Sequence, residues 1–353
     1  MPTANPNKPL QPEFDLIING TPVSTQVEPY VIGVTVEGDT ELPSMFAIEL
    51  TGAETQTQDI PWIDDPLFSI GNVVEVKMGY AKNVTSLITG EITSLEPEFS
   101  FDRKPSLTVR GYDRRHRLQR GLKTRTFVQQ KDSDIANQIA SEAGFATKVT
   151  DSRVVHDYVI QAEQSDMDFL QERAKRLHYE ILVQDKTFIF RPVAYTESAR
   201  LTLAMDEDLL EFFPRLSAHH QVSQVEVRGW SMKDKKELVS KGQQRITMGG
   251  QKTGADLSAQ SFGKSIGGIR ASPTATQAET DQLAAARFKA LSLEFITGTG
   301  MCWGRTDLQP GTVVKLKGLG TRFSGDYYVV SVRHHYAPDL GYQTQFTVRR
   351  TAS

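Results

Sequence analysis

The sequence predicts an α+β protein that is mainly β, with two tube-like antiparallel β-barrel domains and a small α+β domain between them. Strand patterns fill the first third of the chain, two helix patterns follow, and strand patterns return near the C-terminus in a similar form. A chain of 353 residues suits two or three domains. The boundaries that we expect are a flexible tail over 1–13, a β-domain over 14–122, the α+β domain over 123–195 and a second β-domain over 196–353.

The first β-rich region alternates apolar and polar residues, which is the period of a strand with one buried face. Val74 and Val76 fall on one side of such a strand, and Glu75 and Lys77 fall on the other. The runs are FDLIING, YVIGVTVEG, MFAIEL, VVEVKMGY, LITGEITSLEP and LTVRGY. One dry face and one wet face are typical of an antiparallel sheet.

The middle of the chain predicts two helices and a hairpin. SDIANQIASEAG begins at Ser133, a fair N-cap, and ends at Gly144, the residue type that commonly follows a helix. SDMDFLQERAKRLHYE begins at Ser165, which with Asp168 resembles a capping box. YEILVQDKTFIFRP then predicts a hairpin that turns at Asp185-Lys186.

The last region predicts strands, one long loop and one helix. The stretch 248–275 is rich in Gly, Ser and Ala and lacks periodicity, so it predicts a loop, which we expect to order only against a neighbouring molecule. QAETDQLAAARFKALSLEF predicts a helix, because apolar residues recur at helical spacing. These residues are Leu283, Ala286, Ala290 and Leu293.

One pattern occurs twice, at opposite ends of the chain. The matching pairs are Gly71–Lys77 with Gly311–Lys317, Thr89-Gly90 with Ser324-Gly325, and Leu107–Arg110 with Phe346–Arg349. Three matches in the same order and at similar spacing predict a structural duplication, which is the smallest case of a repeat architecture.

The composition excludes few functions. A net charge of −3 gives no general attraction to nucleic acid or to an anionic membrane. A single cysteine, Cys302, leaves no disulfide framework within the chain and fits a reducing compartment. The first residues lack the apolar core of a signal peptide, and no run of about 18 apolar residues predicts a membrane span.

A basic cluster, DRRHRLQRGLKTR, runs from Asp113 to Arg125. One interpretation is a phosphate-binding patch. The other is a solvated linker whose arginines pair with acidic groups on nearby domains. The acidic balance of the chain and the lack of interleaved aromatic residues favour the second interpretation.

Catalytic motifs are weak, and we expect no enzyme, no cofactor and no metal. GKSIG, from Gly263 to Gly267, satisfies the pattern of a nucleophile elbow, but no strand precedes it and no helix follows it. A phosphate-loop interpretation fails because Ser258 stands where that motif needs its first glycine. The histidines form no zinc-binding pattern, and His334 and His335 would point to opposite faces of a strand.

The acidic run Asp206, Glu207 and Asp208 predicts a solvated turn. Carboxylates that folding brings together, as in glycosidases, stay open as an alternative.

The chain resembles the hub proteins of contractile injection machines: phage late control protein D, the baseplate hub of myophage tails, and the N-terminal part of VgrG spike proteins. Three stretches carry the resemblance: LITGEITSLEPEF…LTVRGYDRRHRLQRG, QSDMDFLQERAKRLHYEILVQDKTFIFRP and LQPGTVVKLKGLG…FSGDYYVVSVRHHY…GYQTQFTVRR. The positions that match are Gly71, Gly90, Gly111, Tyr112, Asp113, Leu118, Ser165, Asp166, Phe169, Leu170, Pro310, Gly311 and Gly325.

The resemblance implies a structural role. In this family three chains, each with two tube-like domains, form a pseudo-sixfold ring that joins the hexameric inner tube to the trimeric spike. It further implies assembly in the bacterial cytoplasm, other baseplate partners and a cargo of DNA or effector protein. Because no spike repeats follow Arg350, we expect the spike to be a separate protein.

Polar residues of the repeated strands are then candidates for the lumen of the ring or for contacts between subunits. They are Glu75, Lys77, Arg110, Lys315, Lys317 and Arg349. Plain solvent exposure is the alternative for each. Two other functions stay open: a tail-associated cell-wall hydrolase and a β-protein that binds carbohydrate or nucleic acid. The sequence does not distinguish a phage tail from an extracellular injection system.

Overall fold

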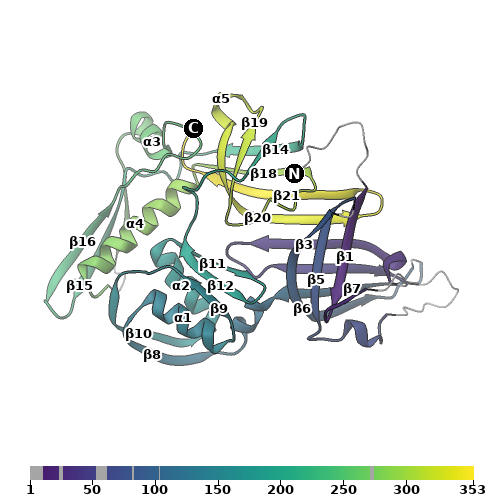
Figure 1. Ribbon diagram of the computed structural model, residues 1–353. Helices are drawn as coiled ribbons and strands as arrows, with labels where there is room; N and C mark the ends of the chain where they lie inside the picture. The colour runs from purple at the N-terminus through teal and green to yellow at the C-terminus, as the bar shows by residue number, and fades with distance from the viewer. Residues whose placement is uncertain (1–10, 24–26, 53–61, 82, 103, 271–273) are drawn as a thin grey trace.

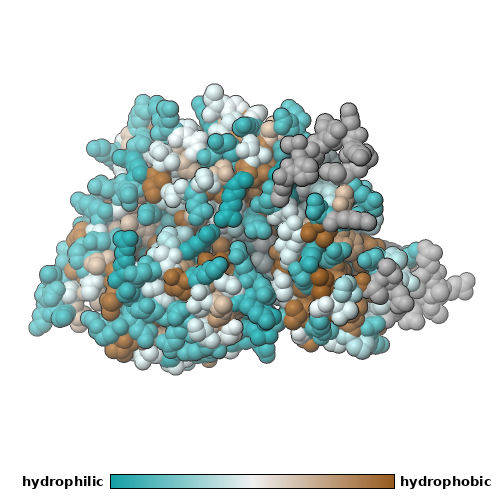
Figure 2. Space-filling model, viewed as in Figure 1, coloured by the Kyte–Doolittle hydropathy of each residue, from teal (hydrophilic) through white to brown (hydrophobic). Residues whose placement is uncertain are grey.

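The computed structural model describes residues 11–23, 27–52, 62–81, 83–102, 104–270 and 274–353, and it is mainly β, as the sequence predicts. Among these residues, thirteen strands form one largely antiparallel sheet, and three smaller sheets and the helices lie beside it (Figure 1). Polar side chains cover most of the face seen in Figure 2, and apolar ones are interspersed among them.

The N-terminal part of the large sheet, which we call half one, has the strand order β3-β4-β7-β6-β5-β1-β2. Its strands are β1 (Pro12–Ile18), β2 (Thr21–Pro22), β3 (Val31–Asp39), β4 (Met45–Thr51), β5 (Val73–Tyr80), β6 (Asn83–Glu98) and β7 (Ser106–Asp113), with 3-10 turns at Glu28–Tyr30, Pro66–Phe68 and Arg114–Gln119. The dry faces enclose a core that includes Phe46, Ile48, Val76 and Val109. Because β1 begins at Pro12, the expected tail is shorter than 1–13, and its residues 1–10 lie outside the described residues.

The C-terminal part of the sheet, half two, has the order β14-β18-β21-β20, with β19 beside β20 and β13 beside β19. Its elements are β13 (Leu201–Ala204), β14 (Leu209–Leu216), β18 (Ile296–Trp303), β19 (Val313–Lys317), α5 (Gly320–Phe323), β20 (Gly325–Ala337) and β21 (Gly341–Arg350). A second core, with Val314, Val329, Phe346 and Val348, lies under this half.

The two halves share one backbone plan. The order β3-β4-β7-β6-β5 in half one corresponds to β14-β18-β21-β20-β19 in half two. The Gly71 N–H donates to the Ile92 carbonyl at 2.8 Å, and the Gly311 N–H donates to the Val329 carbonyl at 2.9 Å. Both glycines have positive φ, 91° and 75°, which a glycine adopts without steric cost. The duplication that the sequence predicts is therefore present in the strand pairing.

Irregularities of the sheet recur at equivalent places. β6 bulges against β7 between Ile92 and Ser94, and β20 bulges against β21 between Val329 and Ser331. β3 is irregular between Val31 and Gly33 against β4, and β14 is irregular between Leu209 and Glu211 against β18. Bulges redirect strands and are built-in features of a sheet, so their coincidence fixes the residue equivalence.

This equivalence corrects two of the three sequence matches. Val74 pairs with Gly90, whereas its counterpart Val314 pairs with Tyr327, so the counterpart of Gly90 is Tyr327 and not Gly325. The third match slips by two residues in the same way, since Gly111 pairs with Ile92 as Val348 pairs with Val329. Strand side chains have a period of two, so a slip of two keeps every residue on its face and is invisible to pattern matching.

The middle region contains the two expected helices and the expected hairpin. Its elements are β8 (Lys123–Lys131), α1 (Asp132–Glu142), β9 (Ala146–Val149), β10 (Val155–Gln164), α2 (Asp166–Leu177), β11 (Tyr179–Gln184) and β12 (Thr187–Pro192). Ser165 caps α2 by accepting from the Asp168 N–H at 3.1 Å, as predicted. The predicted start of α1 was two residues late, because Lys131 and not Ser133 is its N-cap.

The predicted long loop at 248–275 was wrong over its described part. It holds α3 (Gly254–Phe262) and β17 (Ile266–Arg270), which pairs in parallel with β15 (Gln224–Ser231) beside β16 (Lys236–Gly242). Thr253 caps α3 by accepting from the Asp256 N–H, and Gly254 lets the helix approach Phe295, because a Cβ there would lie 2.5 Å from that ring. The expected helix α4 (Gln277–Leu293) covers this small sheet (Figure 1).

Candidate functional site: the open face of the joined sheet

The two halves of the large sheet meet where β3 pairs with the second part of β20. Six residues of β20, from Ser331 to Tyr336, pair antiparallel with β3. On the wet face of this junction the Arg333 guanidinium lies 3.4 Å from a Glu37 carboxylate oxygen, and Thr35 Oγ1 lies 3.0 Å from His335 Nδ1. The wet faces of both halves thereby become one continuous surface.

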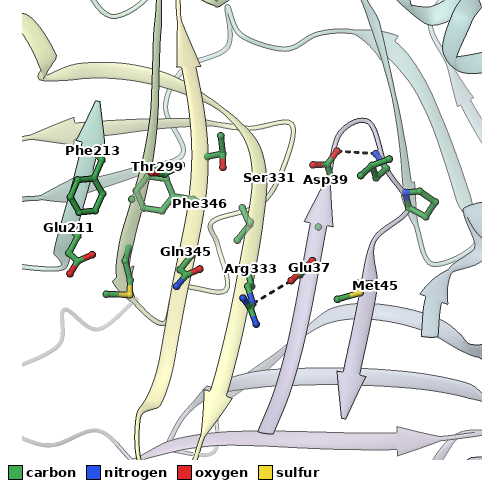
Figure 3. A pocket seen from close by; sticks show the side chains of 17 residues that line it. Glu37, Asp39, Met45, Glu211, Phe213, Thr299, Ser331, Arg333, Gln345 and Phe346 are labelled. Atoms are coloured by element: carbon green, nitrogen blue, oxygen red, sulfur yellow. Dashed lines mark hydrogen bonds and ion pairs between the residues drawn. The ribbon is translucent and has the colours of Figure 1, made fainter. Parts of the chain in front are cut away.

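A shallow groove of about 470 Å³ crosses this surface over the junction (Figure 3). Residues that oppose one another in successive strands form a row across it: Glu211, Met301, Gln345, Arg333, Glu37 and Met45. Carboxylates, a guanidinium, an amide and thioethers alternate in this row. The groove therefore offers a mixed, wet surface and no deep cavity with a single chemistry.

Arg110 lies on the same wet face, and the other candidate lumen residues do as well by strand alternation. The Arg110 guanidinium donates to both Glu96 carboxylate oxygens, at 3.0 and 3.2 Å. This hydrogen bonding raises the pKa of Arg110 and lowers the pKa of Glu96. Arg110 is thus held in place and not freely mobile.

The remaining candidates are spread over two separate places. Glu75 and Lys77 pair with each other at 3.6 Å on β5, and Lys315 on β19 lies 3.6 Å from Asp326. Lys317 is exposed at the end of β19, and Arg349 opposes Thr297 and Tyr328. The structure brings only Glu75 and Lys77 of the six into contact with one another.

The part of the wet face that precedes each bulge is covered. In half one, Glu91 is buried and is bound by Arg114, His116 and Arg117. Burial opposes ionisation of Glu91, but hydrogen bonds from Arg117 and His116 outweigh it and lower its pKa. The pairing of the basic cluster with acidic groups is confirmed here, but the segment is not a solvated linker, because it forms the 3-10 helix Arg114–Gln119 and Glu91 and Arg115 are buried.

Other members of the basic cluster are paired as well. Arg115 is 1% exposed and lies 2.8 Å from the Asp113 carboxylate. Lys123 and Arg125 each lie 2.6 Å from Asp166. A phosphate-binding patch is not formed by these side chains.

In half two the covered position is occupied differently. Tyr328, the counterpart of Glu91, donates its hydroxyl proton to Glu180 of β11, and Arg191 lies 2.7 Å from the same carboxylate. Burial raises the pKa of Glu180 and of Tyr328. The open part of the face therefore begins after the bulge in both halves.

The positions of the family resemblance have structural tasks. Gly90 and Gly111 leave room for the Phe46 ring, because a Cβ on Gly111 would lie 2.3 Å from it. Asp113 accepts from the Ser44 N–H at 2.8 Å, which fixes the turn between β3 and β4. Pro310 packs on Gly38 at the junction. Tyr112 opposes Met45 on the wet face. Phe169 and Leu170 lie with Leu118 in the core of the middle region. Gly325 has a positive φ of 137°.

The catalytic hypotheses find no supporting geometry. Ser265 lies after helix α3 and before strand β17, which is the reverse of a nucleophile elbow. Asp206 and Glu207 are exposed in the turn before β14, as predicted, while Asp208 lies 3.3 Å from Arg305. Within the described ranges, no three metal-ligating side chains cluster, and no helix there is long and apolar enough to cross a membrane.

His334 and His335 point to opposite faces, as expected. His334 is buried and its Nδ1 lies 2.8 Å from the Tyr342 hydroxyl. Burial lowers the pKa of His334 to about 4. Cys302 is also buried, which raises the pKa of its thiol to about 12.

The junction residues Glu37, Arg333 and Thr35 were not singled out from the sequence, and His335 was considered only for the direction of its side chain. Their alternation in VTVEG and SVRHHY shows that they lie on wet faces. No local pattern shows that β3 and β20, about 300 residues apart, are neighbours.

The chain belongs to the Alg8 N-terminal domain family, whose model matches residues 10–338. This is not the late control protein D family that the motifs resemble. Among curated proteins, no sequence matches the chain.

Solved structures show the same fold at low sequence identity. The chain is similar to the 43 kDa tail protein of prophage MuSo2 from Shewanella oneidensis, with a TM-score of 0.74, 12% identity, and coverage of 96% of this chain and 98% of that chain. A tail protein from Neisseria meningitidis MC58 gives 0.69 and 14%, covering 96% and 97%. A type VI secretion component of Escherichia coli, described as structurally similar to T4 tail proteins gp27 and gp5, gives 0.59 and 14%, covering 92% and 74%.

Proposed function

We propose that this chain is a structural component of a phage tail or a related injection machine, and that it is the baseplate hub there. In this role three copies form a ring that joins a hexameric inner tube to a separate trimeric spike. The fold likeness to two tail proteins and to a type VI secretion component supports the general class.

The observation that carries the hub proposal is the internal duplication. Each chain contains two halves with the same strand order and the same bulges, joined edge to edge by β3 and β20. Three copies would present six equivalent halves to a hexameric tube and three equivalent chains to a trimeric spike. A cyclic ring would also cover sheet edges that otherwise promote aggregation.

In this ring the open face of the joined sheet is the surface that we assign to the channel. Its mixed charge, with Arg333 paired to Glu37 and Arg110 paired to Glu96, suits passage of DNA or effector protein without tight binding. The role is mechanical, and no catalytic residue is proposed. The chain would be assembled in the bacterial cytoplasm and become part of a virion tail or an extracellular injection particle.

Electron microscopy of the purified protein, alone and mixed with its cognate tube and spike proteins, tests the proposal. We expect rings with threefold symmetry, six lobes and a central hole, bound to tube and spike. Monomers both in the pure sample and in the mixture would contradict it. Clearing of a peptidoglycan suspension by the purified chain would instead favour a hydrolase.

A further inference from the structure

The equivalence of the two halves shows one strand partner that is present in half two and missing in half one. β20 uses one side for β21, and divides its other side between β19 before the bulge and β3 after it. β6 uses one side for β7, and its other side pairs with β5 only up to Glu91. Within the described residues, Ser94–Pro97 have no strand partner on the side where β20 carries β3.

The strand that would fill this gap is also identified by the equivalence. The counterpart of β3 is β14, which forms the other end of the sheet; in the part of the chain that the structure describes, β18 is its one strand partner, and Leu209 makes an isolated bridge to Met205. β3 and β14 each have an irregularity at the equivalent place near the beginning of the strand. Counting along the strands from there, Glu37 corresponds to Arg215 and Asp39 to Ser217. Both sides of the internal junction, β20 and β3, therefore have a counterpart in the same chain, the end of β6 and β14, that lacks this strand partner among the described residues.

We propose that the β6 edge of one copy pairs antiparallel with the β14 edge of the next copy, in the register of the internal junction. This inference rests on the proposed ring and names the surfaces that close it. Ser331 opposes Asp39 and Arg333 opposes Glu37 within the chain. The same register between copies places Ser94 opposite Ser217, Leu95 opposite Leu216, and Glu96 opposite Arg215.

The charges of this contact are complementary, with the signs exchanged. Within the chain, a guanidinium on β20 lies 3.4 Å from a carboxylate on β3. Between copies, the guanidinium of Arg215 on β14, which is exposed, would meet the carboxylate of Glu96 on β6, which already accepts from Arg110 of its own chain. Opposite charges directly across two strands stabilise the pair, and like charges destabilise it.

Exposed apolar side chains lie at both edges. Phe99 is 58% exposed beyond the end of β6, and Phe213 is 65% exposed on β14. Leu216, the expected partner of Leu95, is 36% exposed. Association would remove Leu216 from water, which favours it, whereas Phe213 lies on the wet face that we assign to the channel.

Prolines make this contact weaker than the internal junction. Within the internal junction, the Thr40 N–H donates to the carbonyl of the opposing Val330 at 3.1 Å, so these two residues form a hydrogen-bonded pair. Every second pair of an antiparallel ladder is hydrogen-bonded, and Val36 with His334 is therefore another such pair. The counterparts of Val36 and His334 are Pro214 and Pro97, which have no N–H to donate. Prolines on edge strands limit pairing with unrelated strands. Because Pro97 and Pro214 lack an N–H, the two edges would be joined more by their side chains than by backbone hydrogen bonds.

Disulfide trapping of the full chain tests the register. Ser94 and Ser217 form a non-hydrogen-bonded pair in the proposed register, whose Cα atoms would lie about 4.5 Å apart, within disulfide range. The variant Ser94→Cys/Ser217→Cys should form covalent dimers and trimers on mild oxidation, because the native Cys302 is buried. Ser331→Cys/Asp39→Cys is the matched control, which should close a disulfide within one chain.

A charge reversal tests the ion pair. Arg215→Glu should weaken self-association on the order of tenfold, as measured by mass photometry across a dilution series, because it opposes Glu96 with a like charge and leaves the pair of Glu96 with Arg110 intact. Arg215→Lys, which keeps the charge, should stay within about threefold of the wild type, and Lys241→Glu on the exposed face of β16 should have no effect. Rings that form without cross-links and ignore the Arg215 reversal would overturn this interface and leave the hub proposal standing. Failure of the wild type to associate, even with tube and spike, would overturn both.

Discussion

The two halves of the large sheet keep the same backbone and use different side chains at equivalent positions. Glu91 in half one is buried in a cluster of basic groups, and its counterpart Tyr328 in half two is buried against Glu180. Asp113 binds Arg115, and the counterpart of Asp113 is Arg350, which donates to backbone carbonyls and stacks on Tyr327. What is retained is strand order, bulge position and face alternation, so the fold constrains these and leaves the buried polar contacts free to change.

The largest expected effect comes from breaking the buried ion pair of half one. Arg115→Ala leaves Asp113 buried without its guanidinium, and the free energy of unfolding should fall by about 3–5 kcal/mol. Urea denaturation of the purified chain measures this change. Arg110→Ala, which removes a more exposed pair with Glu96, should cost less than about 1 kcal/mol. Equal losses of stability in the two variants would show that burial does not determine how much an ion pair contributes here.

Titration of His334 should make the free energy of unfolding depend on pH. Half one has no equivalent contribution, because the counterpart of His334 there is Pro97. The folded pKa of His334 is lowered to about 4 from 6.5, so the unfolded chain binds a proton first as the pH falls. His334 therefore favours folding fully above pH 6.5, and about 3 kcal/mol of this contribution is lost by pH 4. His334→Asn should flatten the stability profile between these values by that amount. An unchanged profile would show that His334 does not stay neutral in the folded chain.

A smaller loss of stability is expected from adding a side chain at Gly111, a position where the core of half one has less space than the core of half two. The counterpart of Gly111 is Val348, but a Cβ on Gly111 would lie 2.3 Å from both the Phe46 ring and the Glu91 carbonyl. Gly111→Ala should therefore cost about 1–3 kcal/mol through overpacking, measured by thermal and urea unfolding. Gly268→Ala is the control, since a Cβ there meets no atom within 4 Å. Similar losses in both variants would mean that flexibility, and not space, determines the cost.

Local sequence signals predicted the local structure well. Ser165 with Asp168 marked the start of α2, and Gly71 and Gly311 marked the turns where each half repeats its backbone. The alternation of Val74 to Lys77 assigned the correct faces. Each of these signals depends on residues within a few positions of one another.

Two kinds of feature were missed for physical reasons. Helix α3 uses small residues to pack closely, so it lacks the apolar periodicity of a typical helix, although Thr253 and Asp256 form a capping signal. The junction of β3 with β20 joins distant segments, and strand pairing leaves no short-range signature. The candidate surface is therefore visible in the sequence only as separate wet faces.

A density map of the assembled oligomer, at a resolution that separates strands, tests the central claim most directly. We expect the large sheets of neighbouring chains to be continuous, with Ser94–Pro97 of one copy beside β14 of the next in the register that β20 and β3 show. An oligomer in which either edge faces solvent, or meets a different strand, would contradict the equivalence of the internal and external junctions.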